Sequence, residues 1–477
     1  MKKQLPYIFI SSVFLIILAP SLFAEGMFMD GLIYASISRN LANGVGTFWD
    51  LHFTETLAPH FQGHPPLVIG IQSLFFRVLG DHFYVERLYS LLVAFLNGFL
   101  IFLITNKSFS LNKNLISNEE LNSIKKYSWV SLAFWITIPR VAWSYSNNIL
   151  ENTMLTFLLI SAFLIIISFG KNRFLMLILA GFSLFLALMS KGFVALFIWG
   201  VVPFYWIAIR QIKFKRAFLD TIIVIVFTIL PLIILLISSP KAYQTLSAYI
   251  DVQIVSSLSI TDSNKNRFEI IFRLFSELLP ILIILILGLL FLIIKKESIN
   301  PFLKYKKEAI FFILIGLSAS LPIAISLKQR DFYLTTSFPF FAIGFALLII
   351  PFLQEKTQDL KFLSNKIIKI SIIGLFFVSI FANMYFWGKI ERDKNKIEDV
   401  KKVCEIVPKN TTINICKQTY SDWSLHGYFA RFSNISISDK GEKKFLLLEK
   451  NCKDRSVDNY KKLNIELNNY FLFEKKY

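Results

Sequence analysis

Residues 221–238 read TIIVIVFTILPLIILLIS and contain no charged side chain. A helix needs about 20 mainly apolar residues to cross the hydrocarbon core of a bilayer. Similar runs recur along the chain and predict eleven spans, at residues 5–24, 84–105, 127–145, 149–168, 173–189, 192–209, 217–238, 269–294, 309–327, 332–352 and 367–388. The sequence therefore predicts an all-α polytopic membrane protein with about 11 transmembrane helices, in a range of roughly 11–13.

Two of these spans are less regular than the others. The run at 127–145 contains Pro139 and Arg140, and only Ser190, Lys191 and Gly192 separate the run at 173–189 from the next one. We expect this second pair to form a short or re-entrant hairpin.

The composition agrees with a membrane protein. Of 477 residues, 55% are hydrophobic and 17% charged, whereas soluble domains are about 25% charged. Soluble multidomain enzymes, secreted disulfide scaffolds and disordered proteins are therefore excluded. The net charge of +19 lies largely in and between the apolar runs, where basic loops face lipid headgroups, so we expect no nucleic-acid partner.

The distribution of Lys and Arg predicts the orientation. With the N-terminus in the cytoplasm, the inner segments hold 20 basic residues and the outer segments before residue 389 hold nine. An odd number of spans then places the tail outside the cell's inner membrane. Lys2-Lys3 followed by an apolar run also fits a cleaved signal peptide, but Leu22 is a poor residue before a cleavage site, and we expect a retained anchor.

The chain is predicted to have two domains, a transmembrane domain at 1–388 and a small outer α/β domain at 389–477. The second shows a helical pattern at 392–407 and strand-like runs at 412–415, 434–438, 445–448 and 470–473. All three cysteines, Cys404, Cys416 and Cys452, lie there. One disulfide can form between two of them, and their spacing fits no zinc pattern.

The first outer loop, 25–83, holds the most informative polar residues. Asp30 opens a segment that suits a short interfacial helix and continues through Tyr34 and Arg39. An Asp at the start of a helix is commonly an N-cap residue. A catalytic role is the alternative, because the positive end of the helix dipole favours an ionised carboxylate there. His60 and His64 follow, and metal binding and hydrogen bonding to an anionic group are both open to them.

Other polar groups mark the outer ends of later spans. They are Glu151, Lys191, Lys328, Arg330, Asp331 and Tyr333. By topology all lie at one membrane face. Lys191 and Arg330 can reach lipid headgroups there, or they can serve a binding site.

In order along the chain, these motifs resemble the GT-C superfamily of membrane glycosyltransferases. The resemblance is to the bacterial relatives of dolichyl-phosphate-mannose protein mannosyltransferases, which include the lipid A aminoarabinose transferases. It covers about residues 1–352 and rests on Asp30, Tyr34-Ala35, Arg39-Asn40-Leu41, Pro65-Pro66-Leu67, Arg87-Leu88, Glu151, Lys191-Gly192 and Tyr333-Leu334 to Pro339. The chain departs from the family pattern at Gly31, Ile33 and Gly63-His64, where relatives carry an acid, an Arg and Glu-Lys.

The resemblance implies transfer of a sugar, with inversion, from a polyprenyl-phosphate donor to a lipid A, glycan or protein acceptor at the outer face of the bacterial inner membrane. It suggests Asp30 as the catalytic base and Lys191, Arg330, His64 and Tyr333 as contacts of the donor phosphate. Glu151, Tyr34 and Arg39 would orient the acceptor or a metal. No cofactor is certain, and a divalent ion at His60 and His64 stays open.

Two other functions fit parts of the pattern. A transporter or lipid flippase would explain the spans, but its charges typically lie at the bilayer midplane. An O-antigen polymerase or ligase handles the same carriers, but such enzymes usually gather Arg and His in one large later loop. Residues 239–268 form only a modest loop without His.

Overall fold

A computed structural model describes residues 4–111, 117–170, 172–255, 267–325, 329–357, 360, 363–452 and 455–476. Within these residues, nine helices are long and apolar enough to cross a membrane. They are α1 (Leu5–Leu22), α4 (Val85–Ser108), α8 (Leu150–Ser168), α9 (Arg173–Lys191), α11 (Phe214–Ser238), α14 (Glu269–Lys295), α16 with η4 (Lys306–Ser320 and Leu321–Ile325), α17 (Phe338–Thr357) and α18 (Lys366–Phe386). The predicted polytopic helical architecture is confirmed.

The predicted span at 127–145 is not one helix. It divides into α6 (Trp129–Thr137) and α7 (Pro139–Ser146), with Ile138 in an extended conformation between them. The ring of Pro139 disfavours helical geometry at the preceding residue, and its missing N–H costs nothing at the first position of a new helix.

The predicted span at 192–209 is also divided. Gly192, with φ +95°, ends α9, and the chain continues as a 3-10 helix, η2 (Phe193–Gly200), and then α10 (Val201–Ala208). A positive φ is accessible to glycine at little cost, so the chain reverses at this residue.

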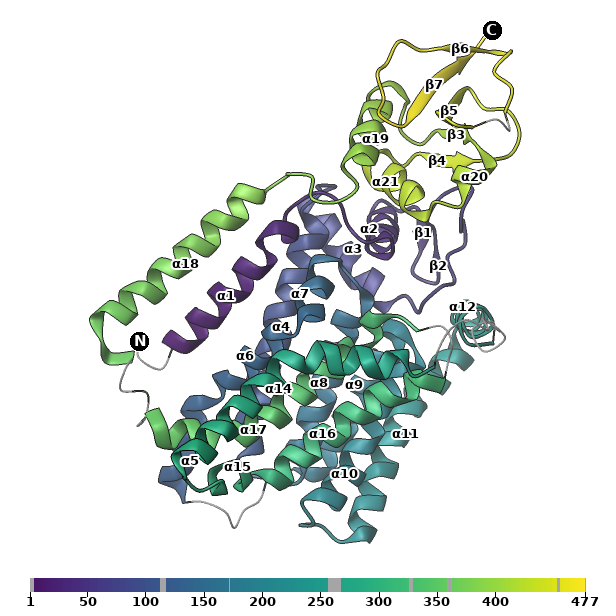
Figure 1. Cartoon of the computed structure of the whole chain (residues 1–477). Helices are drawn as coiled ribbons and strands as arrows, with labels where there is room; N and C mark the ends of the chain where they lie inside the picture. The colour runs from purple at the N-terminus through teal and green to yellow at the C-terminus, as the bar shows by residue number, and fades with distance from the viewer. Residues whose placement is uncertain are drawn as a thin grey trace.

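Shorter elements cover the two ends of the membrane bundle (Figure 1). At the end that carries the sheet domain lie α2 (Met29–Ala42), β1 (Gly46–Thr47), β2 (Asp50–Leu51), α3 (Leu67–Leu79) and α12 (Pro240–Tyr249). The remaining short elements are α5 (Asn118–Ile124), η1 (Lys125–Tyr127), η3 (Ile250–Val255), α15 (Asn300–Leu303) and η5 (Asp331–Thr336). The first and last membrane-spanning helices of the described residues, α1 and α18, pack along each other beside the bundle.

The C-terminal part forms a small α/β domain on the bundle. Its five-stranded sheet has the order β4-β3-β5-β7-β6, with β3 parallel to β4 and β5 and the other pairs antiparallel. The elements are α19 (Lys394–Ile406), β3 (Thr412–Ile415), α20 (Lys417–Tyr420), α21 (Trp423–Ser433), β4 (Ser436–Ser438), β5 (Phe445–Glu449), β6 (Tyr460–Lys462) and β7 (Tyr470–Lys475). The sequence predicted α19 and four of these strands, and it missed α20, α21 and β6.

Cys416 and Cys452 form the disulfide, and Cys404 is a free thiol. The pair joins the end of β3 to the turn after β5, so it closes a loop within the sheet domain.

Candidate functional site

Asp30 lies in the first turn of α2, where Phe28 occupies the N-cap position. The Asp30 side chain is half-buried, and the positive end of the helix dipole favours its ionised form. Because another residue is the N-cap, the alternative role of Asp30 as the N-cap residue is not supported.

Glu151 and Lys191 form an ion pair between the first turn of α8 and the last turn of α9. Their side chains are 3% and 9% exposed. Since taking two charges out of water is costly, such a pair is retained mainly where it serves a site or fixes a structure. Within the described residues, the second carboxylate oxygen of Glu151 is buried and has no hydrogen-bond partner.

Two tyrosine hydroxyls lie in the field of both carboxylates. Burial holds the pKa of Tyr34 well above its usual value, and the charges of Asp30 and Glu151 raise it further. Burial likewise raises the pKa of Tyr333 in η5, with added contributions from Glu151 and Asp30. Both hydroxyls therefore stay protonated at neutral pH and can donate hydrogen bonds beside the carboxylates.

Aromatic rings enclose the ammonium group of Lys191. Its Nζ lies 5.2 Å from the ring centre of Phe332 and 5.1 Å from that of Tyr333. Cation–π contacts of this kind stabilise a buried cation. The Tyr249 hydroxyl, whose pKa is raised to about 12 by burial, donates to the backbone oxygen of Lys191 at 3.0 Å.

The outer loop contributes His64 to this cluster. Its ring packs edge-on against Tyr34, with centres 5.7 Å apart, and lies 6.4 Å from the ring of Tyr249. His60 has different surroundings, because it is exposed and pairs with Asp50 at 2.8 Å. Among the residues described, no group of three or more His, Cys, Asp or Glu side chains could hold a metal ion.

Of the remaining predicted residues, Arg330 lies near the polar cluster, whereas Arg39 contacts the C-terminal domain. Arg330 is exposed at the N-cap of η5, and its charge acts on the Tyr333 hydroxyl. Arg39 lies in the last turn of α2 and donates to Ala430 and Asn434 of α21 and its C-cap, so the structure does not bring it to Asp30. Lys328 lies outside the described residues.

Two asparagines between α7 and α8, which carry no recognisable signal in the sequence, hold this part of the chain against α2. Asn147 Oδ1 accepts a hydrogen bond from the backbone N–H of Phe28 at 2.7 Å, and Asn148 Nδ2 donates to the backbone oxygen of Gly31 at 3.3 Å. These bonds fasten the start of α2 to the start of α8. They therefore fix Asp30 relative to Glu151.

Gly31 is required by this close approach. A Cβ atom at this position would lie 2.2 Å from the backbone oxygen of Asn147, so a residue with a side chain does not fit without a shift of the backbone. We expect Gly31→Ala to destabilise the protein by about 1–3 kcal/mol through overpacking. The measurement is thermal or denaturant unfolding in detergent. Gly374→Ala in α18 is the matched control, since nothing lies within 4 Å of its Cβ position; equal effects of the two would contradict the packing argument.

A charged network borders the aromatic side of the site. Arg140 Nε lies 3.3 Å from Glu277 Oε1, and its Nη2 lies 2.7 Å from Asp331 Oδ2. Arg273 Nη1 lies 2.5 Å from the same Asp331 oxygen. The network links α7 and α14 to η5, and it thereby holds the segment that carries Tyr333.

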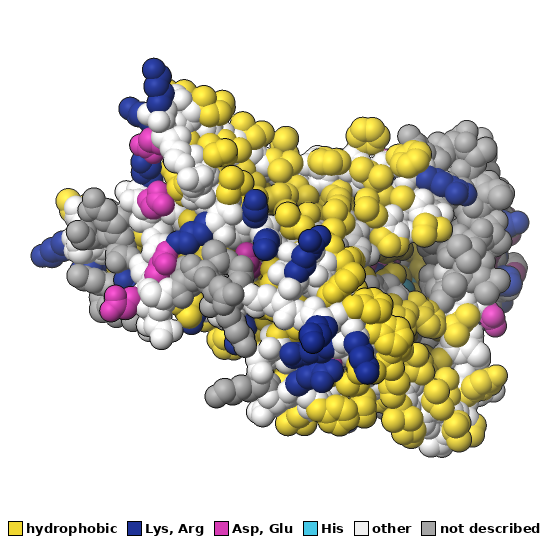
Figure 2. Space-filling view, turned by 90° about the horizontal axis from the view of Figure 1, so that it is seen from below, with side chains coloured by type: hydrophobic (Ala, Val, Ile, Leu, Met, Phe, Trp, Pro, Cys, Tyr) yellow, Lys and Arg dark blue, Asp and Glu magenta, His cyan; other side chains and the backbone are white. Residues whose placement is uncertain are grey.

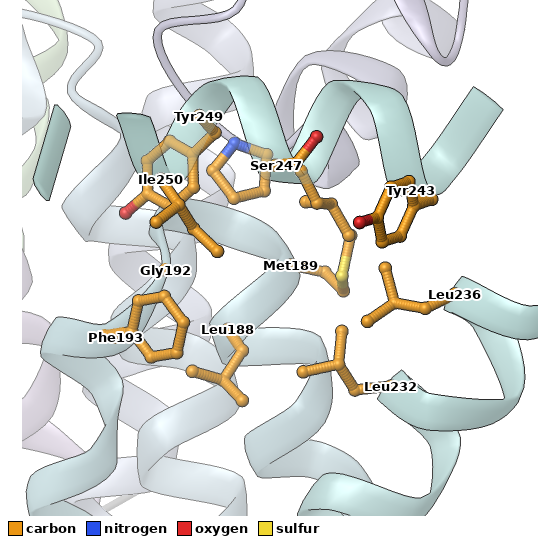
Figure 3. Close-up of a pocket in the computed structure, with 12 residues that line it drawn as sticks. Leu188, Met189, Gly192, Phe193, Leu232, Leu236, Tyr243, Ser247, Tyr249 and Ile250 are labelled. Atoms are coloured by element: carbon orange, nitrogen blue, oxygen red, sulfur yellow. The ribbon is translucent and has the colours of Figure 1, made fainter. Parts of the chain in front are cut away.

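An apolar cavity of about 120 Å³ opens next to the polar cluster (Figure 3). Leu188, Gly192 and Phe193 line one side, and Leu232 and Leu236 of α11 line another. Tyr249 and Gly192 belong both to this cavity and to the immediate surroundings of Lys191. The site therefore combines two carboxylates and a cation with an adjoining apolar chamber.

No protein-family model and no curated protein matches the sequence. The fold is similar to that of ArnT from Cupriavidus metallidurans bound to undecaprenyl phosphate, with a TM-score of 0.63, 10% identity and coverage of 97% of both chains. It is also similar to the archaeal oligosaccharyltransferase AglB from Archaeoglobus fulgidus in complex with an inhibitory peptide and a dolichol-phosphate, with a TM-score of 0.51, 12% identity and coverage of 94% of this chain and 69% of that one. This likeness shows that the chain shares the fold of these two structures, as the resemblance to the GT-C superfamily predicted.

Proposed function

We propose that this protein is a membrane glycosyltransferase that moves a sugar from a polyprenyl-phosphate carrier to an acceptor hydroxyl. The observation that carries the proposal is that Asp30 acts on the buried pair of Glu151 and Lys191, whose neighbours Gly192 and Tyr249 line an apolar cavity. The two similar structures are bound to undecaprenyl phosphate and to a dolichol-phosphate, which supports the same class of donor.

In the proposed reaction, Asp30 takes the proton of the acceptor hydroxyl as its oxygen attacks the anomeric carbon. The bond from that carbon to the phosphate oxygen breaks, so the sugar joins the acceptor with inversion and polyprenyl phosphate leaves. Charge develops on the departing phosphate. Lys191, Arg330 and the Tyr333 hydroxyl are the groups we assign to stabilise it, together with His64 when its ring is protonated.

Glu151 has a double role in this scheme. One oxygen holds the Lys191 ammonium, which keeps two further donors for an anion. The other oxygen has no partner among the described residues and can accept a hydrogen bond from the acceptor. The apolar cavity beside Tyr249 is the natural place for the first isoprene units of the carrier.

The charge distribution supports a site on the outer face. Seen from the end away from the sheet domain, the surface carries many basic and few acidic side chains among apolar ones (Figure 2). Exposed basic residues lie in and beside the segments that connect α10 to α11 and α14 to α16. They include Arg210, Lys213, Lys215, Lys295, Lys296, Lys306 and Lys307. By the positive-inside rule this end faces the cytoplasm, so Asp30 and the sheet domain would lie outside.

The test is a comparison of envelope glycolipids and glycoproteins by mass spectrometry, in cells with and without the gene. We expect one sugar-bearing product to disappear, its unmodified acceptor to accumulate, and the wild-type gene to restore both. If no acceptor loses a sugar and polyprenyl-linked sugar collects instead on the cytoplasmic side, a transporter would replace the proposed transferase.

A further inference from the structure

The segment that leads to Asp30 is joined by backbone hydrogen bonds to the start of the C-terminal domain. The N–H of Glu25 donates to the backbone oxygen of Lys389 at 2.8 Å, and the N–H of Glu391 donates to the backbone oxygen of Glu25 at 3.0 Å. The Glu25 carboxylate also pairs with Lys401 of α19. This short parallel bridge fixes the chain five residues before the proposed base.

Side chains on both sides of Asp30 belong to the core of the C-terminal domain. Met27 is 2% exposed and Leu32 is 4% exposed, and both pack in the cluster formed by α19, α21 and the sheet. The Tyr428 hydroxyl accepts a hydrogen bond from the N–H of Met27 at 3.4 Å. Gly427 lets α21 come close, since a Cβ atom there would lie 3.0 Å from the Cβ of Leu32.

The far end of α2 is held by the same helix. Arg39 is 3% exposed and its guanidinium donates to the backbone oxygens of Ala430 at 2.9 Å and Arg431 at 3.3 Å. It also donates to Asn434 Oδ1 at 3.1 Å. A planar guanidinium that forks to several acceptors fixes both distance and angle.

A buried ion pair in turn joins the domain to the membrane bundle. Arg431 Nε and Nη2 each lie 3.0 Å from an oxygen of Glu86 at the start of α4, and Nη1 lies 2.6 Å from Asp81. A bidentate pair of this kind resists rotation as well as separation.

From these contacts we infer that the C-terminal domain is a positioning element for catalysis: it holds α2 at both ends and so fixes the Asp30 carboxylate against Glu151 and Lys191. Tyr428 and Arg39 are the positioning residues. The inference rests on the proposed function, because it assigns a catalytic consequence to the docking. It predicts that the domain acts on turnover and not on carrier binding.

The test uses the full-length protein with Tyr428→Phe and Arg39→Lys, one variant at each end of α2. Tyr460→Phe is the matched control, because the Tyr460 hydroxyl donates to Lys443 within the same domain and touches no part of α2. Three quantities are measured: amide hydrogen exchange of residues 25–33 in detergent, affinity for undecaprenyl phosphate, and product formed by gene-deleted cells that express each variant at equal level.

For both variants we expect faster exchange in residues 25–33, unchanged affinity for undecaprenyl phosphate, and product formation reduced about 10-fold or more, as small displacements of catalytic groups produce. The control should match the wild type in all three. Faster exchange with undiminished product would overturn the inference and leave the proposed function intact. Unchanged exchange would overturn it as well. A wild-type protein that restores no product would overturn the proposed function, and the catalytic inference with it, whatever the exchange data show.

Discussion

Asp30→Asn is expected to lower sugar transfer by about 10²–10⁴-fold, the usual contribution of a positioned general base. An amide has nearly the same shape as a carboxylate but cannot take a proton from the acceptor hydroxyl. The weakened interaction with the dipole of α2 should cost about 0.3–1 kcal/mol of folding stability. The measurement is product formation in gene-deleted cells, with the amount of inserted protein determined in the same membranes.

Asp50→Asn is the matched control for this experiment. Asp50 lies in the same outer loop, but its side chain is 53% exposed and pairs with His60 away from Glu151 and Lys191. It should keep wild-type transfer. Normal turnover in the Asp30 variant would refute its assignment as the base, and equal loss in both variants would point to damage of the loop.

Arg431→Ala is expected to destabilise the docked structure by about 3–5 kcal/mol, the usual cost of removing one partner of a buried ion pair. The side chains of Arg431 and Glu86 are only 5% and 3% exposed, so the Glu86 carboxylate would be left buried without its cation. The free energy of unfolding, or the thermal midpoint in detergent, measures the effect.

Arg455→Ala provides the comparison for this second prediction. Arg455 lies in the same domain and donates to the backbone oxygens of Gly441 and Asp439 there. Its loss should change stability by far less. If the two variants unfold alike, the Arg431 pair does not hold the domain to the bundle.

Hydropathy predicted the membrane bundle well because bilayer thickness sets the length of an apolar run. It could not define the helix boundaries inside two runs. Pro139 and Gly192 stand within or beside apolar sequence that has the length of a span, and only their backbone geometry divides it. Most strands of the sheet domain were visible as short apolar runs, but α21 was missed because its buried face mixes polar and apolar residues.

For the candidate site, topology showed which polar groups share a membrane face but not which of them meet. Asp30, Glu151, Lys191 and Tyr333 come together, whereas Arg39 turns toward the C-terminal domain. From sequence alone the two outcomes look the same, because an arginine near a membrane surface suits an anion as well as a protein carbonyl.

Some residues around the site were missed for a different reason. Glu277 is an acid inside an apolar run, which was a usable signal, since such a group requires a partner. Asn147, Asn148 and Arg431 carried no such signal, because their partners lie far away in the sequence.

The contact between Met27 and Tyr428 spans 401 residues of chain and has a consequence for biogenesis. At a synthesis rate of about 5–20 residues per second, the ribosome adds Tyr428 roughly 20–80 s after Met27. For most of that interval the segment from Met27 to α3 is complete, but the domain that packs against α2 is not yet made. A nascent or prematurely terminated polypeptide would therefore insert without becoming competent, and maturation would wait for the end of translation.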